Sequence, residues 1–276
     1  MKLEEQLRRT LRLKGHAQST EKAYVTRYRQ FINFVKTKKQ RYVHPAELDH
    51  KEVENFLSYL ANDKKVSPAT QRSALSALKF LYEDVLNIEL SGLTFARAPK
   101  RAKLPVVLSF GETRKLLDLF TGTSRLQSEL MYGCGLRISD CLKLRIKDID
   151  FESKTIQINH SKGSKSRLLM LPNSVVPRLQ EQLEVARTMF QSMREYGGQV
   201  SMPEALGFKA PSWAESWDWF WVFPANQDSK HPRSKALRRF HIGREKYCRE
   251  FKRAKQSCQI SKAIVPHTWR HSRTNQ

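Results

Sequence analysis

The sequence has no long apolar run, so a protein held in a membrane by a hydrophobic helix is excluded. No stretch approaches the roughly 20 apolar residues that a membrane span needs. Residues 1–5 (MKLEE) also lack the apolar segment of a secretion signal. We therefore expect a cytoplasmic protein with no membrane partner.

Cysteine is scarce and unpatterned. The chain has four cysteines without CxxC spacing and without a histidine at the intervals of a metal site: Cys134, Cys141, Cys248 and Cys258. Reduced thiols in the core or on the surface are the simplest interpretation. Neither a disulfide framework nor a metal site is expected.

Acidic residues are few relative to basic ones, and this imbalance indicates the partner. Lys and Arg number 50 against 27 Asp and Glu, which gives a net charge of +23. Such an excess implies a polyanion, either an anionic membrane surface or a nucleic acid. Because no membrane-binding segment is evident, nucleic acid is the better interpretation. The 276 residues, 39% of them hydrophobic, are enough for two domains with buried cores.

Residues 1–93 have the pattern of a small helical domain. Tyr24, Tyr28, Phe31 and Val35 recur at helical spacing. Ser67 followed by proline is a strong helix-start signal, and a further apolar stripe follows it. Basic residues are scattered over the polar faces, which by itself is typical of any solvated surface.

Residues 94–105 form a basic linker. The segment has no acidic residue, and its prolines oppose a helix. Its cations are Arg97, Lys100, Arg101 and Lys103. An extended basic linker suits a polymeric anion that both domains contact, and a plain solvated tether is the alternative.

Residues 106–276 are expected to form a second domain, in which helices surround a small antiparallel sheet. Two short strands are expected at residues 155–159 and 167–171, joined by a hairpin at 161–165. Helical patterns precede them, and a longer one covers residues 175–196. The fold class is therefore mainly α with a small antiparallel β-sheet (α+β).

Three motifs in this domain could act together on a phosphodiester. GLRISD places Arg137 after a glycine turn, with Asp140 one helical turn later to hold it. SKGSKSR places Lys162 at the hairpin tip, and PHTWRHS places His267 and Arg270 three residues apart. Arginine offers planar donors to phosphate oxygens, and lysine or histidine can pass a proton to a leaving oxygen. Each motif alone is weak, so the specificity lies in finding all three in this order.

These motifs resemble those of the tyrosine recombinase (phage integrase) family, and within it the integron integrases. GLRISD resembles the first arginine box, SKGSKSR the lysine hairpin and PHTWRHS the second box, while LPVVL at 104–108 resembles the start of the catalytic domain. The match runs to Ser272. The resemblance implies an N-terminal core-binding (SAM-like) domain and a catalytic domain that clamp DNA between them.

The resemblance also implies residue roles. Arg137 and Arg270 would hold the scissile phosphate, with Asp140 supporting Arg137. Lys162 would donate a proton to the leaving 5′ oxygen, and His267 would assist proton transfer.

Lys165 is the alternative to Lys162 and is otherwise expected to contact DNA. The family needs neither metal nor ATP, because a phosphotyrosyl link conserves the bond energy. Its members assemble as tetramers on DNA.

A tryptophan-rich insertion at about 197–243 favours the integron type over phage or chromosome-dimer recombinases, which lack it. Four of the five tryptophans lie within residues 213–221, beside a basic segment. Core packing is the alternative for such a cluster. In integron integrases this region recognises extrahelical bases of a folded single-stranded site, a task suited to aromatic rings beside arginine. The expected DNA-contacting residues are Trp219, Pro232, Arg238, Arg239 and His241, whereas Phe240 departs from the histidine usual in the family.

The sequence has no nucleophilic tyrosine after the second box. It runs six residues beyond Arg270, and the last four residues (RTNQ) are polar where the family has an apolar helix. A frameshift or a premature stop is expected, in preference to an incomplete sequence. The resemblance therefore predicts a recombinase by descent that is inactive alone. The alternative is a non-catalytic DNA-binding protein that competes with or joins full-length integrase.

Overall fold

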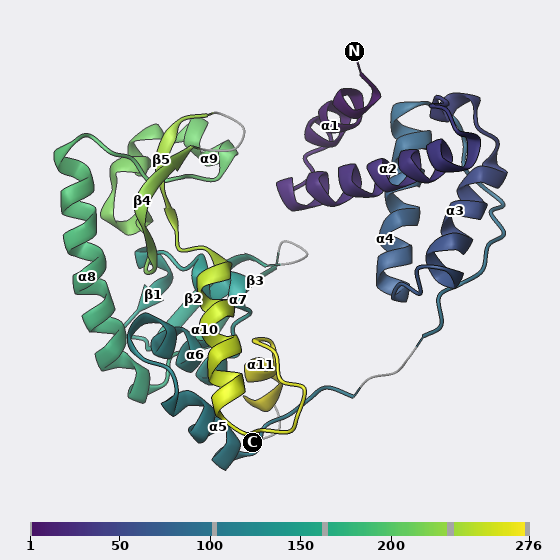
Figure 1. The fold of residues 1–276 in the computed structure, drawn as a ribbon. Helices are drawn as coiled ribbons and strands as arrows, with labels where there is room; N and C mark the ends of the chain where they lie inside the picture. Colours follow the sequence, from purple (N-terminus) through teal and green to yellow (C-terminus); the bar gives the residue numbers. More distant parts are fainter. Residues whose placement is uncertain (1, 101–103, 162–164, 231–234, 274–276) are drawn as a thin grey trace. The chain divides into compact units, whose positions relative to one another are not determined.

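The computed structural model describes residues 2–100, 104–161, 165–230 and 235–273, and the chain divides into two units. The N-terminal unit is Met1–Lys103 and the C-terminal unit is Leu104–Gln276 (Figure 1). The mainly helical fold with small antiparallel sheets that the sequence predicts is confirmed.

The N-terminal unit is a helical bundle. Its elements are α1 (Leu3–Leu13), α2 (Gln18–Lys39), α3 (His50–Asn62), α4 (Pro68–Lys79) and a π-helical turn at Phe80–Val85. Ser67 caps α4, because its hydroxyl accepts a hydrogen bond from the Thr70 amide while Pro68 takes the first helical position. The core includes Leu7, Phe31, Phe56 and Leu78.

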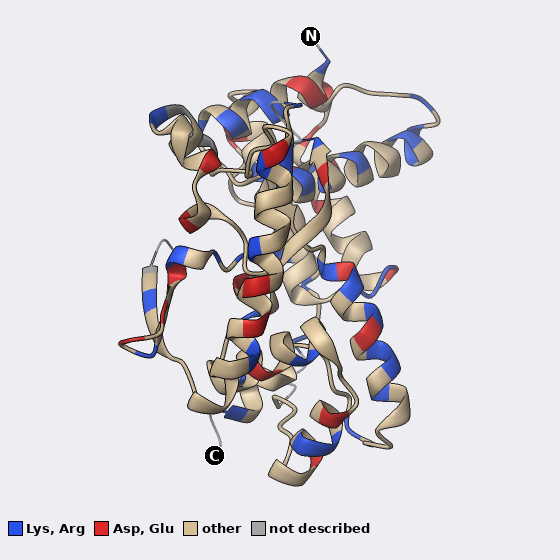
Figure 2. Ribbon diagram, turned by 90° about the vertical axis from the view of Figure 1, so that its left-hand side faces the viewer, with Lys and Arg blue, Asp and Glu red and all other residues tan. Residues whose placement is uncertain are grey.

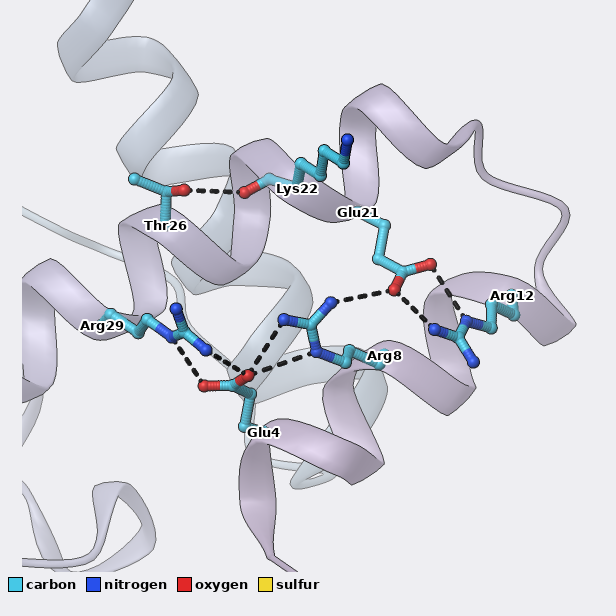
Figure 3. A network of polar contacts seen from close by, with 7 residues as sticks. All are labelled: Glu4, Arg8, Arg12, Glu21, Lys22, Thr26 and Arg29. Carbon is cyan, nitrogen blue, oxygen red and sulfur yellow. Dashed lines mark hydrogen bonds and ion pairs between the residues drawn. The ribbon is translucent and has the colours of Figure 1, made fainter. Parts of the chain in front are cut away.

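Helix α1 is attached to α2 by ion pairs as well as by apolar packing (Figure 3). Glu21 is 3% exposed and accepts hydrogen bonds from Arg8 at 3.0 Å and Arg12 at 2.8 Å. Glu4 pairs with Arg29 at 2.8 Å. Part of the unit's positive charge therefore stabilises helix packing, and these arginines are poor candidates for DNA contact.

The basic linker lacks regular structure over its described part, but its first residues run along the N-terminal unit. The Thr94 amide donates to Glu54 at 2.6 Å, and the Ala98 amide donates to the Gln71 side chain at 2.9 Å. Arg97 and Lys100 are exposed, whereas Arg101 and Lys103 lie outside the described residues. Residues 94–98, the first part of the predicted linker, thus pack against the N-terminal unit.

In the C-terminal unit, helices surround a three-stranded antiparallel sheet in the order β1 (Ile149–Asp150), β2 (Thr155–Ser161), β3 (Lys165–Met170). Ile156 pairs with Leu169 in the β2–β3 register. The helices are α5 (Phe110–Asp118), α6 (Gly122–Gly133), α7 (Ile138–Leu142), α8 (Val176–Glu195), α10 (Arg244–Ser257) and α11 (Thr268–Arg273). Their apolar faces share one core with the sheet.

The insertion contains a second sheet that the sequence pattern does not reveal. It comprises α9 (Glu204–Lys209), two 3₁₀ turns (Pro211–Glu215 and Trp217–Trp219) and an antiparallel pair, β4 (Pro224–Lys230) and β5 (Leu237–His241). Phe220 and Trp221 form a small separate core with side chains of α8. Part of the tryptophan segment therefore packs internally.

Lys and Arg recur along the helices of both units, with Asp and Glu interspersed (Figure 2). Within the described ranges, no helix is long and apolar enough to cross a membrane.

Candidate phosphate-binding active site

Arg137 is presented at the turn between α6 and α7. Gly135 adopts φ +65°, a left-handed conformation that glycine tolerates best, and reverses the chain after α6. Arg137 then takes the N-cap position of α7 in extended conformation. Its guanidinium is 36% exposed and lies 3.5 Å from the Asp140 carboxylate, so its contact with that carboxylate is long and weak.

Arg270 reaches the same turn from α11, far along the chain. Its Nη1 donates to the Gly135 carbonyl at 2.9 Å, and its side chain is half-buried. The neighbouring Trp269 is fully buried and donates to the Tyr247 hydroxyl at 2.9 Å, which anchors α11 in the core. The structure thus brings the two predicted arginine boxes together.

Arg167 of β3 joins this pair, although the sequence analysis assigns it no role. Its Nη2 lies 2.8 Å from the Asp140 carboxylate, closer than Arg137. The signal was present, because Arg167 ends the SKGSKSR motif that carries the predicted lysine. Asp140 therefore forms its shorter ion pair with Arg167. Because its contact with Arg137 is long, the Arg137 guanidinium can bind another anion.

The three arginines affect one another electrostatically. Burial lowers the pKa of Arg270, and the charges of Arg137 and Arg167 lower it further. The Asp140 carboxylate opposes this effect and raises the pKa of Arg270. We call Arg137, Arg167 and Arg270 the arginine cluster. Its excess positive charge suits a phosphodiester, whose oxygens accept charge-assisted hydrogen bonds.

His267 lies at the edge of the arginine cluster, immediately before α11. Burial lowers its pKa first, followed by the neighbouring His271, Arg270 and Arg137. The His267 and His271 rings are 4.7 Å apart and perpendicular. Because its pKa is lowered, the His267 imidazole is neutral at pH 7. It can then accept a proton or donate a hydrogen bond.

The two candidate lysines stay as predictions. Lys162 lies outside the described residues. Lys165 begins β3 and pairs with Ser161, but its side chain is outside the described part. No group of three or more His, Cys, Asp or Glu side chains that could hold a metal occurs among the residues described.

The predicted DNA-contacting residues of the insertion differ in their environments. Arg239 is 6% exposed, pairs with Asp228 and donates to the Tyr196 hydroxyl at 2.8 Å. We therefore revise its expected role from DNA contact to structural support. His241 is half-buried with its ring against Trp221, and burial lowers its pKa.

Arg238 and Trp219 are half-buried, and Pro232 lies outside the described residues. The Nε of Arg238 is buried without a hydrogen-bond partner in the described structure. Trp219 stacks on Trp213, so the ring expected to receive a base is already partly covered.

Sequence profiles of known families match both units. The profile of the phage integrase N-terminal SAM-like domain matches residues 3–91, and that of the phage integrase family matches residues 107–275. The chain belongs to the phage integrase family. The fold is therefore that of a tyrosine-type site-specific recombinase.

Known proteins similar to this recombinase align with most of its length. A protein of Escherichia coli named Integrase/recombinase is 44% identical over 274 residues, 99% of this chain and 80% of that protein. A protein of Thermosipho africanus named Tyrosine recombinase is 27% identical over 185 residues, 63% of each. A structure of lambda integrase, a tetramer bound to a Holliday junction, aligns with a TM-score of 0.59 at 17% identity, covering 98% of this chain and 67% of that one. This last likeness concerns the fold alone.

DNA binding by the recombinase should take up a proton at His267. A phosphate beside the imidazole raises the lowered pKa, so affinity should rise as pH falls through the window between the free and bound values. Isothermal titration calorimetry of DNA binding at pH 6, in buffers of different ionisation enthalpy, measures the protons taken up. We expect uptake of a fraction of a proton, and a smaller uptake in His267→Gln. Equal uptake in His267→Gln and in the control His50→Gln would contradict this role.

Replacing Arg167 should weaken DNA binding through Asp140. In Arg167→Met, the Asp140 carboxylate has only Arg137 of these two arginines to pair with, and it draws the Arg137 guanidinium away from the DNA phosphate. We expect DNA affinity to fall about tenfold, because one positive charge is lost and Arg137 binds the phosphate less well. Fluorescence anisotropy measures it. With Asp140→Asn as the background, the effect of Arg167→Met should shrink, and a fully additive double variant would rule out coupling through Asp140.

Proposed function

We propose that this recombinase acts in the integration and excision of integron gene cassettes by site-specific strand exchange. The observation that carries the proposal is the arginine cluster with the Asp140 carboxylate and the adjacent neutral histidine. A DNA substrate would place the protein in the cytoplasm of a bacterium. Lambda integrase has been crystallised as a tetramer bound to a Holliday junction. By analogy, we propose that strand exchange here would also use a tetramer on DNA.

In the proposed reaction, Arg137 and Arg270 donate hydrogen bonds to the non-bridging oxygens of the scissile phosphate. These guanidiniums stabilise the charge that grows on the oxygens as a tyrosine hydroxyl of a full-length integrase protomer attacks the phosphorus and the 5′ oxygen leaves. Lys162 delivers a proton to the leaving 5′ oxygen, and His267 assists proton transfer. No metal or nucleotide cofactor enters this scheme.

The insertion supports the integron type. Its tryptophans and basic residues suit the unpaired bases of a folded single strand, which stack on aromatic side chains. We propose that both double-stranded and folded single-stranded recombination sites are bound.

Each tyrosine of the C-terminal unit contacts other side chains of that unit. Tyr247 is buried against Ser128 and Trp269, and the Tyr196 hydroxyl contacts Asp228. Tyr132 packs its ring on Trp269. We propose that a polypeptide of residues 1–276 alone binds DNA without a covalent link, and would compete with or join full-length integrase protomers.

Two assays on one polypeptide test the proposal. Incubation with nicked suicide substrates of folded and duplex sites, resolved under denaturing conditions, should trap no protein–DNA adduct. Gel shifts of the same DNAs should show binding that falls steeply with salt, because many phosphates are contacted. A trapped adduct would refute the non-covalent role, and no binding of folded sites at low salt would refute the integron assignment.

A further inference from the structure

A cavity of about 420 Å³ lies between the start of α6 and one face of α10. This volume falls in the range of roughly 300–1,000 Å³ that is usual for small-molecule sites. Its lining comes from residues 119–127 and 242–257, which include neither His267 nor a member of the arginine cluster. The cavity is therefore a feature separate from the candidate active site.

Gln127 supplies a buried donor to the wall of this cavity. The residue is 3% exposed, and its Nε2 has no hydrogen-bond partner in the described structure. Burying a side-chain amide without a partner is unfavourable, so such groups in folded proteins nearly always meet an acceptor. An acceptor atom inside the cavity would satisfy this amide.

The first turn of α6 adds further donors. Thr121 is the N-cap residue of α6, and its side chain makes no capping hydrogen bond in the described structure. Thr121, Thr123 and Ser124 all line the cavity, and the first turn has no acidic residue. The amides of a first turn lack partners within the helix, and the helix dipole adds partial positive charge there. This end of α6 therefore favours an anion over a neutral acceptor.

Two cations line the cavity from α10. Lys246 and Arg253 lie on one face of the helix and are both exposed. Glu250 lies between them on the same face and also lines the cavity. Two cations against one carboxylate leave the described lining with an excess of positive charge, which again favours an anionic ligand.

The aromatic wall between the two helices is held in place. Phe120 stacks on Tyr247, with ring centroids 5.9 Å apart and an interplanar angle of 7°. The Tyr247 hydroxyl lies 2.8 Å from the Ser128 hydroxyl and accepts a hydrogen bond from Trp269 at 2.9 Å. Because packing and hydrogen bonds fix this wall, a ligand would not need to order it on binding.

We propose that this cavity is a binding site for a small phosphate monoester. The phosphate accepts hydrogen bonds from Gln127 Nε2 and the first turn of α6, and it pairs with Lys246 and Arg253. Its three terminal oxygens match donors that come from two helices, whereas a carboxylate offers two oxygens. The organic group of the ligand lies beside Phe120 and Ile242.

Such a phosphate can belong to a free molecule or to a DNA backbone, and the structure favours the free molecule. Gln127 is 3% exposed, so a ligand reaches its amide from within the cavity. A backbone phosphodiester is joined to the DNA chain on both sides, whereas a monoester can enter the cavity with its terminal oxygens first. The inference therefore goes beyond strand exchange and does not depend on the proposed function.

Isothermal titration calorimetry with AMP as the probe tests the site, and adenosine is the control ligand that lacks the phosphate. We expect AMP to bind with a dissociation constant below about 1 mM and adenosine not to bind. Gln127→Leu should lower AMP affinity about tenfold, because a hydrogen bond to a charged group is lost. Its thermal stability should equal or exceed that of the wild type, since leucine removes an unpartnered buried amide.

Charge variants of α10 give a matched comparison. Arg253→Gln should weaken AMP binding several-fold. Arg249→Gln removes an exposed arginine of the same helix outside the cavity lining, and it should change AMP affinity less than about twofold. Glu250→Gln should strengthen binding, because it removes the opposing charge. Thermal unfolding verifies that each variant is folded.

Three results would overturn the proposal. Absence of AMP binding, or equal losses in Arg249→Gln and Arg253→Gln, would leave only a general attraction of anions to a basic protein. Unchanged AMP affinity in both Gln127→Leu and Glu250→Gln would show that the ligand lies elsewhere. If duplex DNA displaces AMP and Gln127→Leu weakens DNA binding by the same factor, the phosphate is that of DNA and not of a free ligand.

Discussion

Trp269→Ala is expected to lower the free energy of unfolding of the C-terminal unit by about 3–5 kcal/mol, the usual cost of removing a buried tryptophan. Trp269 is 0% exposed, and its ring contacts those of Phe120, Tyr132 and Phe251. Its Nε1 donates to the Tyr247 hydroxyl, which the variant leaves without this donor. Because Trp269 adjoins Arg270, the loss should also loosen the arginine cluster.

Urea denaturation monitored by circular dichroism measures this effect. Trp213→Ala is the matched control, since that ring is 42% exposed and its removal should cost far less stability. A loss below about 1 kcal/mol in Trp269→Ala would show that α11 is not anchored by this side chain.

Arg270→Ala is expected to reduce DNA affinity about 10- to 100-fold, because a half-buried guanidinium makes strong charge-assisted hydrogen bonds to phosphate. The slope of log K against log salt should fall by about one unit. Arg137→Ala should act in the same direction, and the double variant should lose less than the sum if both arginines hold one phosphate.

Arg125→Ala is the control for the loss of an arginine as such. Its guanidinium is 19% exposed and already paired with Asp118 and Glu129, so DNA should gain little from it. Titrations at three salt concentrations separate the variants. An equal loss in Arg125→Ala and Arg270→Ala would mean that the affinity reflects net charge and not a phosphate site.

The sequence was sufficient to predict many elements of both units, because they depend on local signals. Apolar residues at helical spacing predicted several helices, the Ser–Pro pair predicted the start of α4, and two short strand segments predicted the β2–β3 hairpin. Arg137, Asp140, His267 and Arg270 were predicted from two short motifs, and the fold brings them together. Their roles in strand exchange stay predictions until tested.

Other features depend on tertiary packing and left no readable pattern. Strand β4 (PANQDSK) lacks alternation, and its pairing with β5 is supported by the buried Arg239–Asp228 ion pair. The sequence marked Arg239 as a surface cation, because a charged residue gives no sign of its buried partner. It also could not show that Trp213 covers Trp219, since stacking depends on the path of the intervening 3₁₀ turns.

The most direct test of the account is a methylphosphonate scan of the bound DNA, in which one phosphate at a time is made neutral. The account predicts one position per half-site where neutralisation lowers the affinity of wild-type protein about 10- to 100-fold but barely affects Arg137→Ala/Arg270→Ala. Small losses spread evenly along the backbone, equal for wild-type and variant proteins, would contradict a defined phosphate-binding active site.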